Sequence, residues 1–326
     1  MYLHVSCLGM DVATSGVTAR DRDSVVSYHL STLEDQFCQT EQLRFFIGTY
    51  NVNGQSPDKH LKEWLEVDQE PPDLYAVGFQ ELDLSKEAFV FMESVKEEEW
   101  TAIVTASLHS GAKYVLVKVV RLVGMMMLVY CKTELLEHVS NVSVDMVGTG
   151  IMGKLGNKGG VGVSLRLHAT ELCFVNSHLA AHQEEYERRN QDYSDICSRM
   201  TFSQYERLSS DYPPLGYKRI KDFDTVFWMG DLNYRINDFD VSEVKELLAE
   251  ENLSALLECD QLKSQQQHRR AFVEYEEGVI TFRPTYKYDP GTSDWDSSEK
   301  GRSPAWTDRV LWRGDRISQT SYRSGL

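Results

Sequence analysis

The sequence predicts an α/β fold built as a two-sheet sandwich, and three observations point to it. Segments rich in β-branched and aromatic residues outnumber segments with helical periodicity, the gaps between them are often of hairpin length, and no composition break divides them after residue 43. Such connectivity favours two packed sheets over a doubly wound parallel sheet. The patterns G-x-G-x-x-G and G-x-x-x-x-G-K-[ST] do not occur, which argues against dinucleotide-binding and P-loop folds.

Eight segments bounded by Gly, Asn, Asp or Pro are predicted strands. They are residues 44–50, 74–79, 114–120, 125–131, 159–167, 172–177, 225–229 and 280–282. Several are apolar throughout, so we expect both faces of their sheets to be covered. Three helices are expected: one after the Ser56-Pro57 pair, one after Asp240, which with Glu243 forms a capping-box pattern, and one over about 182–200.

The domain boundary is placed at the start of the strand pattern. Residues 1–42 have little apolar periodicity and are predicted to be a flexible lead-in, while 43–326 form one domain. The six cysteines are scattered without a C-x-x-C pair, and the first residues lack the pattern of a secretory signal. The longest uncharged apolar run, 122–131, is about half the roughly 20 residues of a membrane-spanning helix. We expect a cytoplasmic protein, soluble or peripheral on a membrane.

The charge balance limits the partners. There are 34 Lys and Arg against 50 Asp and Glu, a formal net charge of −16. The average surface therefore repels nucleic acids and anionic membranes. An anionic ligand must be held by a local basic pocket.

Polar side chains recur where the predicted strands end. They are Asn51, Asn53, Glu81, His178, His182, Asp231, Asn233 and Asp308. Each alone has an ordinary explanation, because Asn and Asp form turns and a single Glu or His is common on a surface. Together they are hard oxygen donors with imidazole, which suits Mg²⁺ and phosphate better than Zn²⁺ and thiolate. Glu81 with Asn51 would supply the few protein ligands that Mg²⁺ needs.

Two segments concentrate positive charge. Residues 147–163 contain no acidic residue and carry Lys154 and Lys158 among closely spaced glycines, whose backbone N–H groups can approach an anion. A second cluster contains Lys287, Lys300, Arg302 and Arg309. The alternatives are a plain Gly-rich hairpin and a solvated loop. Arg188 and Arg189, in turn, are either ligand-binding residues or an ordinary helix surface.

Apolar side chains lie in two of the predicted loops. They are Phe89, Phe91, Ile151 and Met152. Such residues either enter a bilayer interface or pack into the core.

Eight motifs in a fixed order carry a resemblance to a known family. They are FFIGTYNVNGQSP (45–57), GFQELDLS (78–85), GTGIMGKLGNKGGV (148–161), NSHLAAH (176–182), ERRNQDY (187–193), WMGDLNYR (228–235), PTYKYD (284–289) and PAWTDR (304–309). With them, residues from about 44 to 312 resemble the catalytic domain of the inositol polyphosphate 5-phosphatases, type II subgroup. Agreement over several motifs in one order is far more specific than a single short pattern.

The resemblance implies a DNase I-like four-layer αββα sandwich and dependence on Mg²⁺. It implies hydrolysis of the 5-phosphate of phosphoinositides such as phosphatidylinositol 4,5-bisphosphate, with soluble inositol polyphosphates as an open second class. The partners would be a phosphoinositide headgroup and the cytosolic face of a membrane, with no nucleic acid. Two alternatives remain: a non-catalytic phosphoinositide-binding module, and a DNase I-like phosphodiesterase, which the −16 charge disfavours.

The resemblance also assigns roles to single residues. Glu81 would bind Mg²⁺ with support from Asn51, Asp231 would orient or activate water, and Asn233 and His178 would contact the scissile phosphate. Asp308 would orient a further catalytic His. The implied substrate contacts are Asn157 and Lys158 at the 1-phosphate, Tyr286, Lys287, Lys300 and Arg302 at the 4-phosphate, His182 at the substrate, and Phe89, Phe91, Ile151 and Met152 at acyl chains or the membrane.

The resemblance extends past the end of this sequence. Family members continue into another strand and an S-D-H-x-P-V-type motif, whereas the sequence here ends at SYRSGL. Loss of a general acid or base typically costs about 10²–10⁴ in rate. We therefore expect the chain as written to be weak or inactive.

Overall fold

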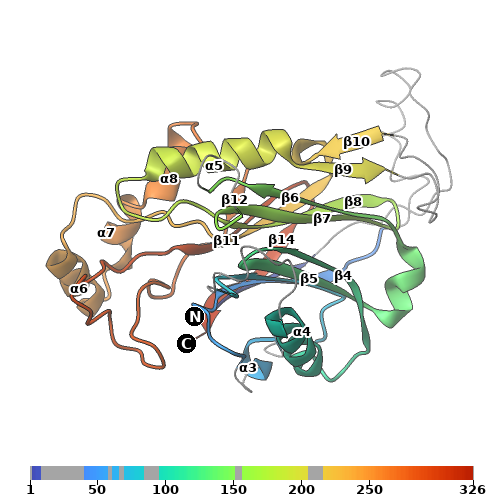
Figure 1. Cartoon of the computed structure of the whole chain (residues 1–326), viewed down its shortest axis with the longest axis horizontal. Coiled ribbons are helices and arrows are strands. Elements are labelled where there is room, and N and C mark those ends of the chain that lie inside the picture. The colour runs from blue at the N-terminus through green and yellow to red at the C-terminus, as the bar shows by residue number, and fades with distance from the viewer. Residues whose placement is uncertain are drawn as a thin grey trace.

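The computed structural model describes residues 2–8 (backbone only), 40–57, 61–65, 70–83, 95–150, 156–204 and 216–325. Two six-stranded sheets pack face to face, and helices lie outside both of them (Figure 1). This four-layer arrangement confirms the predicted sandwich.

The first sheet has the order β14-β1-β2-β3-β5-β4. Only β2 and β3 run parallel, and the other neighbours are antiparallel. The bounds are β1 Tyr2–Leu8, β2 Arg44–Asn51, β3 Leu74–Gln80, β4 Tyr114–Leu122, β5 Met125–Lys132 and β14 Ser318–Gly325. Residues 45–47 and most of β3 and β5 are buried because this sheet is covered on both faces.

The second sheet has the order β12-β13-β11-β8-β7-β6, and β8 and β11 are its parallel pair. The bounds are β6 Val139–Gly148, β7 Gly159–Leu167, β8 Thr170–His178, β11 Thr225–Asp231, β12 Glu276–Glu277 and β13 Asp308–Arg313. A separate two-stranded sheet joins β9 Thr201–Gln204 to β10 Gly216–Arg219. Each large sheet therefore contains one parallel pair near its centre.

Helices cover the outer faces (Figure 1). The first sheet is covered by α3 and α4, the second by α5 and α8, and α6 and α7 lie at one end of the molecule. The bounds are α3 Lys62–Leu65, α4 Val95–Ser107, η2 Thr133–His138, α5 Tyr186–Arg199, η4 Ile220–Asp222, α6 Val241–Ala249, α7 Leu253–Glu258 and α8 Gln261–Gln267. Among the described residues, no helix has the length and apolar character needed to cross a membrane.

Local sequence explains how α6 begins and how α5 packs against β7. Asp240 caps α6 by accepting from the backbone N–H groups of Ser242 and Glu243, and the Glu243 side chain accepts from the backbone N–H of Asp240, as the capping-box pattern predicts. Glycines of β7 allow α5 and the residues after it to pack closely. A Cβ at Gly162 would lie 2.6 Å from Met200 Sδ, and one at Gly160 would lie 3.2 Å from Ile196 Cδ1.

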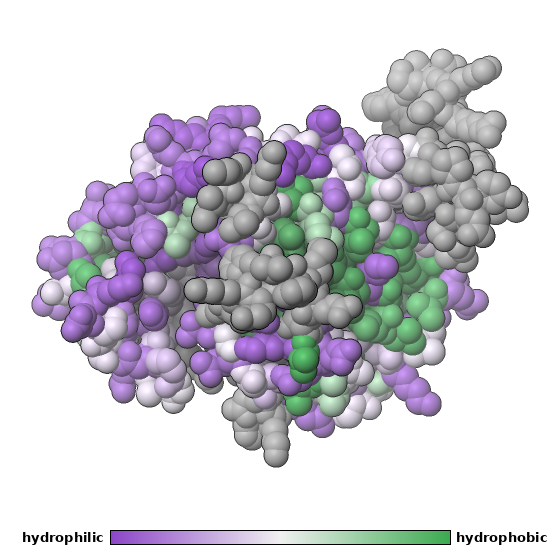
Figure 2. Space-filling model, in the orientation of Figure 1, coloured by the Kyte–Doolittle hydropathy of each residue, from purple (hydrophilic) through white to green (hydrophobic). Residues whose placement is uncertain are grey.

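The core between the sheets is apolar and aromatic. Phe174 and Phe227 stack with ring centroids 5.7 Å apart, and Phe45 meets Phe227 edge-on at 5.9 Å. At the side where β4 and β6 lie next to each other, Figure 2 shows apolar side chains on the surface. Met146 of β6 is 37% exposed.

Two predictions about elements are wrong. Tyr2–Leu8, placed in the flexible lead-in of 1–42, is a strand between β14 and β2, where neighbours on both sides satisfy its backbone groups. Residues 280–282 form no strand. Ile280 packs in the core and Phe282 meets Tyr322 edge-on, so these residues are held by side-chain contacts without a ladder. The expected S-D-H motif concerns residues beyond Leu326 and stays a prediction.

Candidate active site

Polar residues from both sheets converge where several strands end. Within the second sheet, Asp231 at the end of β11 is opposite His178 of β8 and opposite Asp308 of β13. Gly159, the first residue of β7, is opposite His178. The ends of four neighbouring strands thus lie at one edge of this sheet, which brings together residues far apart in the chain.

The centre of the site is defined by distances to one imidazole nitrogen. His178 Nε2 lies 3.4 Å from Asp231 Oδ2 and 3.8 Å from Glu81 Oε1. Asn51 Nδ2 donates to Asp231 Oδ2 at 2.9 Å. Asn51 ends β2 and Glu81 follows β3 in the first sheet, whereas His178 and Asp231 belong to the second. The predicted convergence of Glu81 and Asp231 is confirmed, while the roles assigned to them stay predictions.

Charge around Asp231 favours its ionised form. Burial alone would raise the pKa of this carboxyl group, but a hydrogen bond from His178 and the positive charge of Lys158 lower it. Removal of the Lys158 ammonium group from water lowers its pKa to about 8, although Asp231 and Glu81 act in the opposite direction. Lys158 Nζ lies against His178 Nε2. The site therefore holds a carboxylate and an ammonium group close together.

Asn233 is fixed in a strained backbone conformation beside this cluster. Its φ is +57°, and its backbone N–H donates to Asp231 Oδ1 at 3.1 Å. Its side-chain Nδ2 donates to the Leu179 carbonyl oxygen at 3.1 Å, and its Oδ1 accepts from Arg235 Nη2 at 2.5 Å. Left-handed backbone at a non-glycine residue recurs at functional sites, where the surroundings hold it in place.

A buried amide bridge beneath the site joins the two sheets and was missed by sequence reasoning. Asn176 Nδ2 donates to the carbonyl oxygens of Phe79 and Met126 at 3.0 and 2.9 Å, and Asn176 Oδ1 accepts from Gln80 Nε2 at 2.5 Å. Gln80 also bonds Thr49. Gln80 precedes Glu81, and Asn176 lies two residues before His178, so the bridge sets the relative position of the two halves of the site. The signal was present in the motifs GFQEL and NSH, where polar residues interrupt apolar strands.

The oxygen donors fit a hard cation. The Glu81 side chain is 30% exposed and reachable from solvent, and Asn51 Oδ1 faces the backbone N–H of Asn53 at 3.0 Å. In the part of the chain that the structure describes, no group of three or more His, Cys, Asp or Glu is arranged to hold a metal. The carboxylate of Glu81 and the amide oxygen of Asn51 suit Mg²⁺, which needs only one or two protein carboxylates and keeps much of its water.

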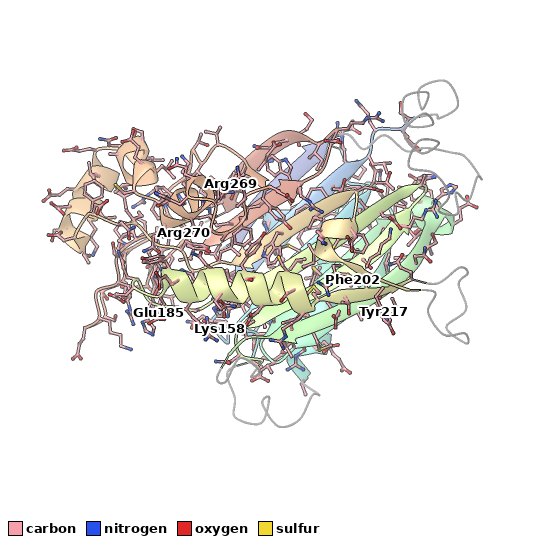
Figure 3. All side chains as sticks on the ribbon, turned by 90° about the horizontal axis from the view of Figure 1, so that it is seen from above. Lys158, Glu185, Phe202, Tyr217, Arg269 and Arg270 are labelled. Carbon is pink, nitrogen blue, oxygen red and sulfur yellow. The ribbon has the colours of Figure 1, made fainter. Side chains whose placement is uncertain are left out.

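Two cavities flank the cluster. One, of about 200 Å³, is lined by Ala181, His182, Gln183, Arg235, Val241, Tyr286, Lys300, Gly301, Arg302 and Ser303. The other, of about 450 Å³, is lined by Thr149, Gly150, Asn157, Lys158, Ala180, Ala181, His182, Glu185, Arg188 and Asp192. Figure 3 shows Lys158 and Glu185 at the same end of α5. His182 borders both cavities.

These cavities separate the predicted substrate residues into two groups. Tyr286, Lys300 and Arg302 share the smaller cavity, and Asn157 and Lys158 share the larger one. Lys287 lines neither of these cavities. The residues predicted to contact acyl chains or a membrane (Phe89, Phe91, Ile151 and Met152) lie outside the described residues, as does Lys154.

Arg309 does not belong to a basic surface cluster, so that expectation is wrong. Its side chain is fully buried and pairs with Asp260 at 3.0 Å and with Glu277 at 2.5 Å. Tyr322 of β14 donates to Glu277. The two carboxylates compensate the buried charge, so Arg309 connects β13 to neighbouring elements and carries no free charge toward a ligand.

Arg189, left open as a helix-surface residue, is a buried part of the site. It donates to the carbonyl oxygens of Ala180 and His182 at 3.1 and 2.6 Å. Asp192, one turn further along α5, accepts from the backbone N–H of Ala180 at 2.9 Å. The two side chains thus hold both polar groups of one loop residue between His178 and His182. The spacing of Arg189, Asp192 and Ile196 on one helix face was the available signal.

Asp308 is buried with one oxygen unpaired. Its Oδ2 accepts from Thr307 Oγ1 at 3.0 Å, whereas its Oδ1 has no partner among the described residues. Burial first, and then the negative charge of Asp231, raise the pKa of Asp308. The role that the resemblance assigns to Asp308 stays a prediction.

Comparisons with known proteins agree with this geometry. The model of the Endonuclease/Exonuclease/phosphatase family 2 matches residues 48–325. The chain is 55% identical over 94% of its length to the type II inositol 1,4,5-trisphosphate 5-phosphatase of Mus musculus, and 37% identical over 92% to inositol-1,4,5-trisphosphate 5-phosphatase 1 of Schizosaccharomyces pombe. It spans only 30% and 27% of these two relatives.

A solved structure gives the same result with nearly full coverage of both chains. The inositol polyphosphate 5-phosphatase domain of SPsynaptojanin, in complex with inositol (1,4)-bisphosphate and calcium, has a TM-score of 0.78 and 34% identity, covering 92% of this chain and 90% of that one. The chain therefore belongs to the endonuclease/exonuclease/phosphatase family and, within it, to the inositol polyphosphate 5-phosphatases. Its homologues are phosphoric monoester hydrolases.

The same fold also serves other proteins. A Cimex nitrophorin in a ferrous NO complex has a TM-score of 0.62 and 24% identity, covering 83% of this chain and 87% of that one. This likeness shows the fold alone. The assignment to phosphatases therefore depends on the site residues and on the more similar relatives.

Proposed function

We propose that this chain hydrolyses the 5-phosphate of a phosphorylated inositol ring with Mg²⁺, acting on phosphoinositides such as phosphatidylinositol 4,5-bisphosphate. The observation that carries the proposal is that carboxylate oxygens of Glu81 and Asp231 both lie within 4 Å of His178 Nε2, between two cavities with cationic side chains. One centre with two flanking cavities suits a ring that carries several separate phosphates. The relatives named as inositol 1,4,5-trisphosphate 5-phosphatases support the same substrate class.

Glu81 and Asn51 are the residues that would hold Mg²⁺. When bound, the ion would neutralise phosphate charge during an in-line displacement at phosphorus. Its chemistry suits the carboxylate and amide oxygens present. The calcium ion in the complex of the SPsynaptojanin domain supports a divalent cation in this family.

The protein residues divide the remaining work. Asp231 is ionised at neutral pH because its pKa is held low, so it orients the attacking water and accepts a proton from it. Asn233 donates to an oxygen of the scissile phosphate and His178 contacts that phosphate, where charge develops as the bond to the ring oxygen breaks. In-line displacement needs positioning and charge neutralisation, and no covalent intermediate on the protein.

The two cavities would bind the other phosphates of the substrate. Lys300 and Arg302 supply positive charge in the smaller cavity, and Lys158 and Arg188 supply it in the larger one. We assign the 4-phosphate to the first and the 1-phosphate to the second. This assignment puts the lipid-bearing position at the larger cavity, and we propose that the chain acts at the cytosolic face of a membrane.

Phosphate release tests the proposal. The substrates are inositol 1,4,5-trisphosphate in solution and phosphatidylinositol 4,5-bisphosphate in vesicles, each with Mg²⁺ or with EDTA. We expect weak Mg²⁺-dependent release that Glu81→Gln reduces by about 10²-fold or more. Glu137→Gln is the matched control, since the Glu137 side chain is 80% exposed. Phosphate release that continues in EDTA would reject the proposed dependence on a metal ion, and binding of the vesicles with no release at all would reject the hydrolase in favour of a binding protein.

A further inference from the structure

Arg235 occupies the boundary between the candidate catalytic cluster and the smaller cavity. It follows Asn233 by two residues, is 7% exposed, and lines the cavity that contains Lys300 and Arg302. No acidic side chain lines this cavity. In the described ranges, Arg235 has no ion-pair partner. A cation this deeply buried without a carboxylate is expensive unless a ligand supplies the negative charge.

The guanidinium group donates two hydrogen bonds to Asn233. Nε donates to the Asn233 carbonyl oxygen at 3.0 Å, and Nη2 donates to Asn233 Oδ1 at 2.5 Å. Asn233 Nδ2 is already engaged with the Leu179 carbonyl oxygen. A carboxamide has two acceptor lone pairs and two N–H donors. The contacts of Oδ1 with Arg235 and of Nδ2 with the Leu179 carbonyl oxygen therefore fix the orientation of the Asn233 amide. They leave one N–H of Nδ2 for a ligand.

The edge of the guanidinium group contacts Asn233, and one of its faces lies against Tyr286. The Arg235 Cζ atom is 4.1 Å from the centroid of the Tyr286 ring, a stacking distance. Of the five guanidinium N–H groups, two are used on Asn233, so donors remain for an anion in the cavity. Arg235 thus contacts a residue assigned to the scissile phosphate and faces the space assigned to a neighbouring phosphate.

We propose that Arg235 is a positioning residue that couples the phosphate next to the scissile one to the orientation of Asn233. The inference rests on the proposed 5-phosphatase function. A phosphate in the smaller cavity neutralises the guanidinium group and fixes its plane, and the fixed plane holds the Asn233 amide with one N–H toward the reacting phosphate. Part of the binding energy of the neighbouring phosphate is then used in the transition state, so it raises kcat and does not merely lower KM.

Two substrates and three variants separate this coupling from a structural role. The substrates are inositol 1,4,5-trisphosphate and inositol 1,5-bisphosphate, which lacks the neighbouring phosphate. Arg235→Gln should lower kcat for the trisphosphate by about 10-fold or more and shrink the kcat ratio between the two substrates toward one. Arg235→Lys keeps the charge without the double contact, so it should retain KM better than kcat.

Arg283→Gln is the matched control. Arg283 also stacks on an aromatic ring, at 4.7 Å from the Trp295 centroid, but it lines neither cavity. It should leave both substrates unchanged. Equal loss of kcat on both substrates in Arg235→Gln would show that Arg235 only supports the fold, and a change in KM alone would show a phosphate contact without coupling. Either result overturns the proposal.

A binding measurement distinguishes failure of this inference from failure of the proposed function. If the wild-type chain releases no phosphate from either substrate, the proposed function fails in that assay. Calorimetric titration with inositol 1,4-bisphosphate and with inositol 1-phosphate then tests Arg235 directly. The inference expects Arg235→Gln to weaken the bisphosphate by about 10-fold and the monophosphate little. It also expects the Asn233 side-chain amide resonance to shift on bisphosphate binding in wild type and not in Arg235→Gln; the opposite result in either measurement contradicts it.

Discussion

Asp231 and Asp308 are paired across β11 and β13, and their pKa values move in opposite directions. Burial raises the pKa of both carboxyl groups. The His178 hydrogen bond and the charge of Lys158 more than compensate at Asp231, whereas Asp308 faces the negative charge of Asp231. Neighbouring carboxyl groups with separated pKa values are suited to different tasks, one as a base and the other as a proton holder.

The first prediction concerns the stability of Asp308→Asn. Because the pKa of Asp308 is raised in the folded state, the folded protein binds a proton more tightly there than the unfolded chain does. This group favours folding at low pH, and the benefit is lost as pH rises from the unfolded value of 3.8 toward the folded one. Asparagine cannot ionise. Urea unfolding should therefore show a gain of about 1–3 kcal/mol for the variant at pH 8 relative to pH 5.

Asp294→Asn, at an exposed position, is the control for that measurement. Its effect should be small and similar at both pH values. If Asp308→Asn changed stability equally at pH 5 and pH 8, the raised pKa of Asp308 would be wrong.

The second prediction concerns Lys158 and the pH dependence of catalysis. With a pKa of about 8, Lys158 is charged below that pH and loses its charge above it. Since its ammonium group contacts His178 and lines the larger cavity, kcat/KM for inositol 1,4,5-trisphosphate should fall as pH rises through about 8. Lys158→Arg, which stays charged, should shift this fall to higher pH.

Lys158→Met gives the size of the effect. We expect kcat/KM to drop by about 10–100-fold, because a charge-assisted contact with phosphate is lost. Lys118→Met, on the exposed part of β4, should have little effect. An unchanged kcat/KM and pH profile in Lys158→Met would remove Lys158 from the site.

The third prediction separates two adjacent arginines. Arg189 is fully buried and donates to loop carbonyl oxygens and to Gln261 Oε1, so Arg189→Met should lower the free energy of unfolding by about 3–5 kcal/mol. The Arg188 side chain is 43% exposed, and Arg188→Met should cost about 1 kcal/mol or less. Urea unfolding measures both. Equal costs would contradict the role assigned to Arg189 in holding the loop after His178.

Much of the fold could be predicted, because strands that are apolar throughout can be recognised from the sequence. The strands predicted at 44–50, 74–79, 125–131 and 225–229 are all present and almost wholly buried. By contrast, β6 and β14 alternate polar residues and are only partly buried, so their sequence resembles a loop. Both are edge strands, and the pairing that defines them comes from distant segments. Tertiary context decides such strands, and local preference does not.

The site residues, too, could be predicted only in part. The convergence of Glu81, His178 and Asp231 could be predicted because each directly ends or follows a recognisable strand. Arg189 and the Asn176–Gln80 bridge could not, because a charged residue in a helix and amides within strands gain partners only when loops and sheets meet. Arg309 misled the prediction for the same reason, since its two carboxylate partners lie 49 and 32 residues away in sequence.

The identity of the product tests the central claim most directly. ³¹P NMR of a reaction with inositol 1,4,5-trisphosphate and Mg²⁺ distinguishes which ring phosphate leaves. The proposed cleavage predicts inositol 1,4-bisphosphate as the sole inositol product, with formation stopped by EDTA and by Asp231→Asn. Loss of the 1- or 4-phosphate, or a product that forms equally well in Asp231→Asn, would contradict it.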